Sequence, residues 1–548
     1  MHKILRTLII IAMLITAYLL ILAWRDFSAA NPVTPITNQT QSVGQDVPAV
    51  GAAGDVPVLS SAGEVVATAP TNDLISVNTD RYELKINPVG GDVVYAALKQ
   101  YDATLNSAEH FVLLENDARV YVAQSGLIGQ DGIDTTAGRA TYSSPQSSYE
   151  LGSQGELLVP LVYQKDGLTI TKTYTFKAGE YPIDVRYTVN NQSEKSWQGQ
   201  MYAQLKRDDS KDPGLEDKGM MSMATYLGGA WGVPNDPYNK LKFADFNDGK
   251  LTAVSRDGWV AMIQHYFVSA WTPKDFDATF YSRASGRDYF IGFNSPVMDV
   301  PAGKQMSFGA TLYAGPKIQK ELQTVAVGME RTVDYGILWP ISKTLFMVLE
   351  ALHKVFNNWG WAIIGLTILV KIALFWFSNK SYVSMAKMRA IAPKLQELKE
   401  KHGDDRMGMS QAMMQLYRDE KVNPMAGCLP ILLQMPIFLG LYWCLVESVE
   451  LRHAPWMLWI KDLSAMDPWF ILPIFMMATM FVQQMLNPQP TDPMQAKMMK
   501  MMPLIFGVFM LFFPAGLVLY WTVNNLFSMA HQHWVNKKVE KEMQAKTA

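Results

Sequence analysis

The sequence predicts an α-helical polytopic membrane protein with six spans and a large exported β-sandwich domain. Two observations lead to this fold class. Several apolar blocks with few charges lie within residues 1–25 and 359–536, although the mean hydropathy of the 548-residue chain is only +0.02. Between these blocks, residues 71–325 alternate apolar and polar side chains with a period of two, which is typical of β-strands.

The composition excludes several classes of protein. With 49% hydrophobic residues and a net charge of −2, the chain is neither disordered nor a nucleic-acid binder that relies on bulk positive charge, so we expect no specific DNA binding. A disulfide scaffold is excluded because there are only two cysteines, Cys428 and Cys444. Both lie in one apolar block, which favours core packing over a redox or metal site. We expect no cofactor and no metal.

The first apolar block, Leu8 to Trp24, follows Lys3 and Arg6 and contains no charge. A cleaved signal peptide is one reading, with Ser28-Ala29-Ala30 as its cleavage site. An uncleaved anchor is favoured, because a spanning helix needs about 17 or more apolar residues and this block has that length. In either case the N-terminus stays in the cytoplasm and the following residues are exported.

Later blocks predict five more spans. Three of them are Trp359–Phe377, Met425–Val446 and Pro468–Met485. The stretch from Lys500 to Lys537 has no charged residue between its ends and is too long for one span of about 20 residues, so we expect two short spans joined at Pro514-Ala515-Gly516. Lysines flank this stretch on both sides, which places both termini in the cytoplasm.

The predicted domain order follows from these blocks. It comprises an N-terminal membrane anchor (1–25), a flexible periplasmic linker (26–70), a periplasmic β-rich domain (71–325), a connecting and interfacial helix (326–358), a membrane core (359–536) with a cytoplasmic helical hairpin (378–423), and a basic cytoplasmic tail (537–548).

One hairpin of the exported domain can be placed by its pattern. Residues 168–176 and 183–189 each alternate apolar and polar side chains, and Ala178-Gly179 stands between them. Gly90-Gly91 and Asn190-Asn191 predict further turns. The domain's two histidines, His110 and His265, stand in no catalytic or metal-binding motif, so we expect a binding or scaffolding module.

Lys371 is a charge inside the second predicted span. Such a charge costs about 2.5–3.5 kcal/mol on insertion scales, so it should face a wet cavity or a polar partner. The alternative is snorkelling, but the cytoplasmic end is about 10 Å away, longer than a lysine stem comfortably covers. Thr367 and Ser378 are expected on the same helix face. Other spans offer polar residues that line the pocket or form interhelical hydrogen bonds: Gln434, Gln483, Gln484, Thr522, Asn524 and Asn525.

The segment after this span holds nine Lys or Arg residues between positions 378 and 423. Ser381–Lys401 and Ser410–Lys421 predict two antiparallel helices, with Pro393 kinking the first. Their charges would meet anionic headgroups, an acidic nascent chain or ribosomal RNA. Alternatively, the segment is simply a solvated positive-inside loop.

Twenty-two of the 33 methionines lie from Met385 onward. These thioethers suit either an adaptable surface for varied clients or gap-filling between helices.

Several motifs in order along the C-terminal half resemble the YidC/Oxa/Alb family of membrane protein insertases. They are Asn358-Trp359-Gly360, residues 367–371, Ser384-Met385-Ala386-Lys387-Met388-Arg389, Lys421-Val422-Asn423-Pro424, Gly427-Cys428-Leu429-Pro430, Gln434-Met435-Pro436-Ile437-Phe438, Asp462-Leu463-Ser464 and Phe513-Pro514-Ala515-Gly516-Leu517. The exported region resembles the family's periplasmic β-supersandwich through position and strand pattern.

The resemblance implies an insertase and chaperone of the bacterial inner membrane without covalent chemistry. Its implied partners are nascent membrane proteins, the Sec translocon, the ribosome and membrane lipids. It implies a hydrophilic groove in which Lys371 takes the place of an arginine common in the family; lysine keeps the charge but loses the bidentate fork. Thr367, Tyr520 and Trp521 match positions that contact the client's transmembrane segment.

The candidate residues form two groups. The groove would contain Lys371, Thr367, Gln434, Tyr520, Trp521 and Asn524, and the cytoplasmic hairpin would present Lys387, Arg389 and Lys394.

Two other classes of protein stay as alternatives. A small-solute transporter or channel with a sensory periplasmic domain predicts inverted repeats and several intramembrane charges. A membrane-anchored sugar-modifying enzyme requires a carboxylate or histidine site in the β domain.

Overall fold

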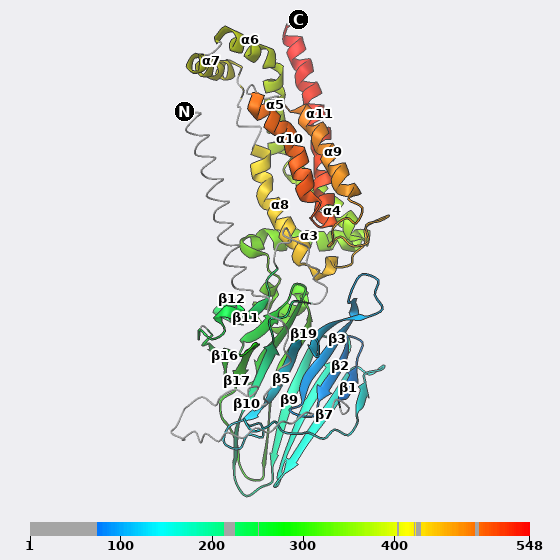
Figure 1. The fold of residues 1–548 in the computed structure, drawn as a ribbon, viewed down its shortest axis with the longest axis vertical. Helices are drawn as coiled ribbons and strands as arrows, with labels where there is room; N and C mark the ends of the chain where they lie inside the picture. The colour runs from blue at the N-terminus through cyan, green and yellow to red at the C-terminus, as the bar shows by residue number, and fades with distance from the viewer. Residues whose placement is uncertain are drawn as a thin grey trace. The chain divides into compact units, whose positions relative to one another are not determined.

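The computed structural model describes residues 74–212, 225–249, 251–402, 405–420, 422, 429–487 and 493–547. The predicted anchor (1–25) and linker (26–70) lie outside these ranges, as does Cys428. Figure 1 shows a part built of long strands and a part built of helices.

The β-rich domain contains two antiparallel-dominated sheets. Its strands are β1 (Ile75–Asn78), β2 (Tyr82–Asn87), β3 (Asp92–Asp102), β4 (His110–Asn116), β5 (Val120–Ile128), β6 (Ser148–Glu150), β7 (Glu156–Lys165), β8 (Leu168–Lys177), β9 (Pro182–Asn191), β10 (Trp197–Arg207), β11 (Gly228–Val233), β12 (Asp236–Leu241), β13 (Val254–Ser255), β14 (Trp259–Ile263), β15 (Phe267–Lys274), β16 (Ala278–Ser285), β17 (Asp288–Asn294), β18 (Met298–Val300) and β19 (Lys304–Pro316).

The two sheets pack against each other as a sandwich. One has eleven strands in the order β13-β16-β17-β10-β5-β4-β3-β2-β1-β6, with β18 paired to β10, and the other has eight in the order β12-β11-β14-β15-β19-β9-β8-β7. Hydrogen bonds cross between them: the Tyr82 hydroxyl donates to Ala314 O at 2.7 Å, and the Trp271 indole donates to Gln204 O at 3.1 Å. The predicted β-sandwich is confirmed.

The predicted hairpin is also present. Strands β8 and β9 pair antiparallel with Ile170 opposite Val189, and buried and less buried residues alternate along both. Gly179 takes a left-handed φ of 79° in the turn between them. The Gly90-Gly91 turn between β2 and β3 is confirmed as well, with φ values of 80° and 63°.

The turn predicted at Asn190-Asn191 was wrong, because both residues belong to β9. Asn191 pairs with Leu168 in the sheet, and its side chain holds the bend that follows. Its Nδ2 donates to Lys195 O at 2.7 Å, and its Oδ1 accepts from Ser193 N at 3.1 Å. An asparagine that favours turns by side-chain hydrogen bonding can therefore stand before the bend rather than within it.

The helices begin at the end of the β domain. They are α2 (Gln319–Val325), α3 (Trp339–Phe356), α4 (Trp359–Ala373), α5 (Phe375–Ala390), α6 (Ala392–His402), α7 (Arg406–Asp419), α8 (Leu429–Glu447), α9 (Ile471–Leu486), α10 (Pro493–Met510) and α11 (Ala515–Thr547), with short 3₁₀ turns that include Val449–Leu451. Figure 1 shows α9 beside α10 and α11, and contacts of α9 with both helices agree with this view.

Helix lengths do not confirm the six predicted spans. Within the described ranges no single helix is both long and apolar enough to cross a membrane. The pair α4 and α5 meets the criterion together, but the two are bent by 68°. Shorter apolar helices cover Leu433–Glu447 and Ile471–Leu486.

The bend falls at Leu374, inside the segment predicted as one span. No proline or glycine stands there, so a break could not be predicted from the residues at this position. The new direction lets α5 pack on α11, where Tyr382 and Ala386 form a buried cluster with Val535 and Val539. Tertiary packing thus determines where α4 ends.

The other predicted breaks are present. The chain interrupts its helix at Ile391, as expected from Pro393, and α7 returns beside α6, although it begins at Arg406 rather than at Ser410. The α10–α11 hairpin turns before Ala515, whose backbone N–H donates to Ala465 O at 2.7 Å. The last helix continues to Thr547, so the segment predicted as a basic tail is helical.

Candidate functional site

Lys371 lies in the last turn of α4 and reaches across to α11. Its Nζ donates to Ser528 Oγ at 2.8 Å, and the Ser528 hydroxyl donates in turn to Asn524 O at 2.8 Å. The lysine is partly buried, and no carboxylate of the described part of the chain lies within ion-pair distance of it. A hydroxyl therefore takes the position that a counter-ion would usually occupy.

Asn524 joins this contact to a second polar group on α8. Gln434 Nε2 donates to Asn524 Oδ1 and, at 3.2 Å, to Tyr520 Oη. Four of the predicted groove residues, Lys371, Asn524, Gln434 and Tyr520, thus lie with Ser528 in two hydrogen-bonded groups that meet at Asn524, one at its backbone carbonyl and one at its side chain. We call these five residues the polar chain.

Sequence reasoning missed Ser528. The signal was available, because Tyr520, Asn524 and Ser528 are spaced by four residues and share one face of a helix. Serine was overlooked because its small hydroxyl is common in membrane helices, where it usually bonds to its own backbone.

Thr367 and Trp521 have different surroundings. The Thr367 side chain is buried, and its hydroxyl donates to Ile363 O at 2.7 Å within its own helix. The Trp521 ring packs with Phe438 and Phe506 at centroid distances of 4.7 and 4.9 Å. Trp521 thus belongs to an aromatic cluster shared by α8, α10 and α11.

Several other predicted pocket residues make contacts that fit the alternative of helix stabilisation. Thr522 donates to Val518 O at 2.7 Å, Asn525 donates to Thr479 Oγ1 at 3.4 Å, and Gln484 accepts from Asn487 at 3.3 Å. Gln483 is partly buried. Ser378 does not share a helix with Lys371, because the bend at Leu374 places it on α5.

The basic residues of the hairpin differ in their partners. Lys394 on α6 forms an ion pair of 2.5 Å with Glu420, which follows α7. Lys387 is partly buried and Arg389 is exposed on α5, and neither has an ion-pair partner among the described residues.

Met388 and Met413 pack against the small core of this hairpin, around Ile391 and Leu395, so these two methionines fill gaps.

Exposed apolar side chains surround the bend beside Lys371. They include Ile372 on α4 and Phe375 and Trp376 on α5. Monomeric soluble proteins rarely expose large apolar side chains side by side, whereas a surface in contact with lipid or with an apolar helix does. The lysine therefore lies next to an apolar outer surface.

Comparisons with known proteins identify the family. The model described as "60Kd inner membrane protein" matches residues 351–542, and that described as "YidC periplasmic domain" matches residues 74–348. The chain is 49% identical over 551 residues to the membrane protein insertase YidC of Pseudomonas entomophila, with 98% of each chain covered. It is 46% identical over 580 residues to that of Ectopseudomonas mendocina, again with 98% of each covered.

The chain belongs to the YidC family of membrane protein insertases. Among solved structures, one described as an active YidC insertase with its first transmembrane domain resolved matches with 17% identity and a TM-score of 0.38, covering 84% of this chain and 92% of the other. That score is low, so the assignment rests on the sequence matches. The chain is a membrane protein insertase of the inner membrane with a periplasmic domain, and its substrates are nascent membrane proteins.

The motif Asn358-Trp359-Gly360 joins the start of α4 to a distant loop in this chain. Asn358 caps α4, its Oδ1 accepting from Trp361 N at 3.2 Å, while its Nδ2 donates to Trp456 O at 3.1 Å in the loop between α8 and α9. A Cβ on Gly360 would lie 2.1 Å from Cδ1 of the Trp456 ring. Asn358 and Gly360 therefore fix this loop to the start of α4.

Proposed function

We propose that the polar chain lines a hydrophilic groove, open to the cytoplasm and to lipid, that receives the polar flank of a client membrane protein. One observation carries the proposal. Lys371 is a cation in a membrane helix without an acidic partner among the described residues, and a single serine hydroxyl binds its ammonium. Because a charge in such a helix is costly to keep, it marks a functional site.

The electrostatics of this arrangement suit an acidic client. A carboxylate that approaches Lys371 gains a strong charge-assisted hydrogen bond in a medium of low dielectric constant, whereas in water the same contact is worth little. Lysine can provide this attraction as a point charge, and the planar fork of an arginine is not required. We infer that Lys371 draws an acidic extracellular tail partway across the membrane.

The remaining groove residues have separate roles in the proposal. Gln434 and Asn524 offer amide groups to the client's backbone, which would otherwise lose its hydrogen bonds in hydrocarbon. Trp521 is partly buried and contacts the client's apolar helix, whereas the buried Tyr520 makes this contact only after its neighbours move aside. The Thr367 side chain is buried and its hydroxyl is bonded to Ile363 O, so in this proposal it supports α4 beside the groove.

Release of the client requires no nucleotide. The apolar helix leaves the groove into lipid beside the third and fifth spans, and burial of its side chains in hydrocarbon provides the driving force. The exposed apolar residues beside Lys371 offer an apolar surface on which the helix can pass into lipid. The groove thus shortens the apolar barrier for the one part of the client that is polar, its flank.

The topology and further partners belong to the same proposal. Six spans place both termini in the cytoplasm, and the basic hairpin faces the ribosome there. Lys387 and Arg389 are the residues offered to ribosomal RNA or to lipid headgroups, because the charge of Lys394 is balanced by Glu420. The protein works alone or together with the Sec translocon.

The test uses purified protein in proteoliposomes with a client that carries an acidic extracellular tail. Lys371→Arg should keep insertion within about twofold of the parent, Lys371→Ala should lower it, and Lys371→Glu should lower it most. The same client with a neutral tail should respond less to all three changes. Lys304→Glu is the matched control, because it makes the same charge change at an exposed position of β19. Undiminished insertion by the Lys371→Glu variant would reject the role of the charge.

A further inference from the structure

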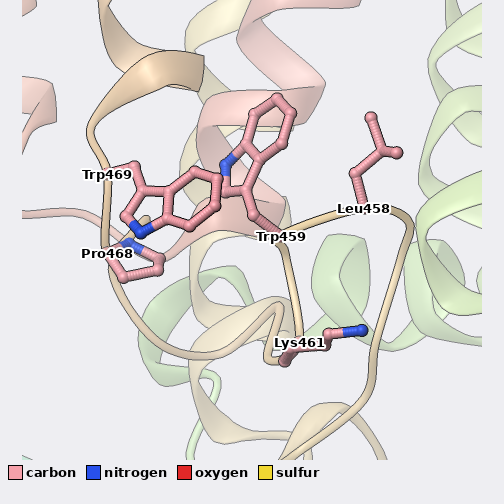
Figure 2. Close-up of a pocket in the computed structure, with 5 residues that line it drawn as sticks. All are labelled: Leu458, Trp459, Lys461, Pro468 and Trp469. Atoms are coloured by element: carbon pink, nitrogen blue, oxygen red, sulfur yellow. The ribbon is translucent and has the colours of Figure 1, made fainter.

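An apolar cavity lies between the α8–α9 loop and the membrane helices, away from Lys371. It measures about 340 Å³, and its lining includes Ile364 of α4, Phe475 of α9, and Leu519, Val523 and Leu526 of α11. It shares Leu458 and Trp459 with a more open pocket of about 560 Å³, which Lys461, Pro468 and Trp469 complete (Figure 2). We call the inner cavity of about 340 Å³ the apolar chamber, and the outer pocket, which carries Lys461, its mouth.

The wall of this mouth is held in place by a buried carboxylate. Asp467 Oδ1 accepts from the Trp459 indole N–H and from Trp469 N, both at 3.0 Å, and its Oδ2 accepts from Leu472 N at 2.7 Å. The two indole rings stack at a centroid distance of 6.0 Å and an angle of 15° (Figure 2). The site is therefore built before any ligand arrives.

Leu458 stands at the boundary between chamber and mouth in an uncommon conformation. Its φ is 54°, in the left-handed region that bulky residues avoid, and 68% of its surface is exposed. Strain of this kind persists where the surrounding structure enforces it, and it concentrates at binding sites. An exposed leucine held there extends the apolar wall outward.

Position and charge define the occupant. The α8–α9 loop contacts the periplasmic domain, because Arg452 Nη2 donates to Asp102 O at 2.7 Å. Tryptophans such as Trp459 and Trp469 favour the level of the lipid headgroups. Lys461 is exposed at this level without an ion-pair partner among the described residues, while its neighbour Asp462 accepts from Ser464 Oγ at 2.7 Å.

The volume of the chamber suits a small apolar group. It is about 340 Å³, at the lower end of the range for small-molecule sites, about 300–1,000 Å³. Part of one acyl chain fits in the chamber, and the rest of the lipid extends through the mouth, where Lys461 lies.

We propose that this chamber binds one phospholipid of the periplasmic leaflet, with an acyl chain between α4, α9 and α11 and its phosphate on Lys461. The stacked indoles border the glycerol region, where an aromatic ring with one polar edge is stable. The bound lipid completes the packing of the α8–α9 loop on the membrane helices. The site is separate from the polar chain and does not depend on the proposed groove.

The experiment uses full-length protein in nanodiscs that contain phosphatidylglycerol with a diazirine in the middle of one acyl chain. After illumination, labelled residues are mapped by mass spectrometry, and Phe509, an exposed residue of α10, reports general contact with lipid. We expect Phe475 and Leu526 to be labelled at least fivefold more than Phe509. Excess unlabelled phosphatidylglycerol should remove this preference.

Variants separate the site from ordinary lipid contact. Val523→Trp fills the chamber and should reduce labelling of Phe475 to the level of Phe509. Val523→Phe should reduce this labelling in part, and it replaces the tryptophan variant if that variant is poorly expressed. Lys461→Glu should reduce the preference at least threefold, and Lys304→Glu should not change it. Equal labelling of Phe475 and Phe509 in the parent protein would overturn the proposal, as would capture of a protein by a photoreactive residue at Leu526.

Discussion

Replacing Glu447 by glutamine should destabilise the junction between the β domain and α8 by about 3 kcal/mol. Lys317 follows β19, and its Nζ donates to Glu447 Oε2 at 2.9 Å and to Thr332 O at 3.2 Å. Only 1% of the lysine side chain and 3% of the glutamate side chain are exposed. The pair therefore joins the periplasmic domain to the end of a membrane helix in a dry environment.

The magnitude follows from two opposing quantities. Opposite charges 2.9 Å apart attract by roughly 6 kcal/mol at an effective dielectric constant of 20. Removing two ions from water costs several kcal/mol each, so the intact pair contributes little net stability. Removing one partner leaves the other charge buried alone, which costs about 3–5 kcal/mol.

A double-mutant cycle tests this reasoning. Glu447→Gln and Lys317→Met should each lower the free energy of unfolding by about 3 kcal/mol or more, whereas the double variant should lose much less than their sum. Tryptophan fluorescence in denaturant titrations of the detergent-solubilised protein measures these values. Asp334→Asn, which breaks the more exposed pair with Lys240, is the control and should cost at most about 1 kcal/mol. Additive effects of the two buried substitutions would refute the reasoning.

Three further predictions concern single residues. Gly360→Ala should lower the melting temperature of the helical part, because its Cβ would lie 2.1 Å from the Trp456 ring; an unchanged melting temperature would contradict the predicted clash. Ser528→Ala should lower insertion of a client with an acidic tail by less than tenfold, since it removes the hydrogen bond of Lys371 but keeps the charge, and Ser528→Thr should restore it. Burial lowers the pKa of Lys172 to about 7, so the folded β domain binds this proton less tightly than the unfolded chain. Stability should therefore rise by up to about 1.4 kcal/mol per pH unit between pH 7 and 9, measured by denaturant titration, and Lys172→Met should remove this slope.

Local patterns predicted individual strands of the β domain better than they predicted the pairing between distant strands. The alternation in residues 168–189 predicted β8, β9 and their turn because one face of each strand is buried. The same pattern gave no information on which distant strands meet. Strand β10 pairs with β5 and β17 in one sheet, and this order depends on how the two sheets close around their common core.

The candidate site was predictable where a residue conflicts with its surroundings. Lys371 was found because a cation in an apolar helix is costly. Its partner Ser528 was not found, because serine causes no such conflict and the contact depends on how α4 and α11 pack. The bend at Leu374 was missed for the same reason, since contacts of α5 with α11 replace a proline or glycine signal.

Helix α11 supports both proposed sites with different faces, so the two can be tested independently. Tyr520, Asn524 and Ser528 recur at intervals of four and carry the polar chain, while Val523 and Leu526 lie on the face that borders the apolar chamber. A charge change at Lys371 should leave labelling by the lipid probe unchanged. Filling the chamber at Val523 should leave the hydrogen bonds of Lys371 intact, and any loss of insertion in that variant would then report a contribution of the bound lipid to the position of α11.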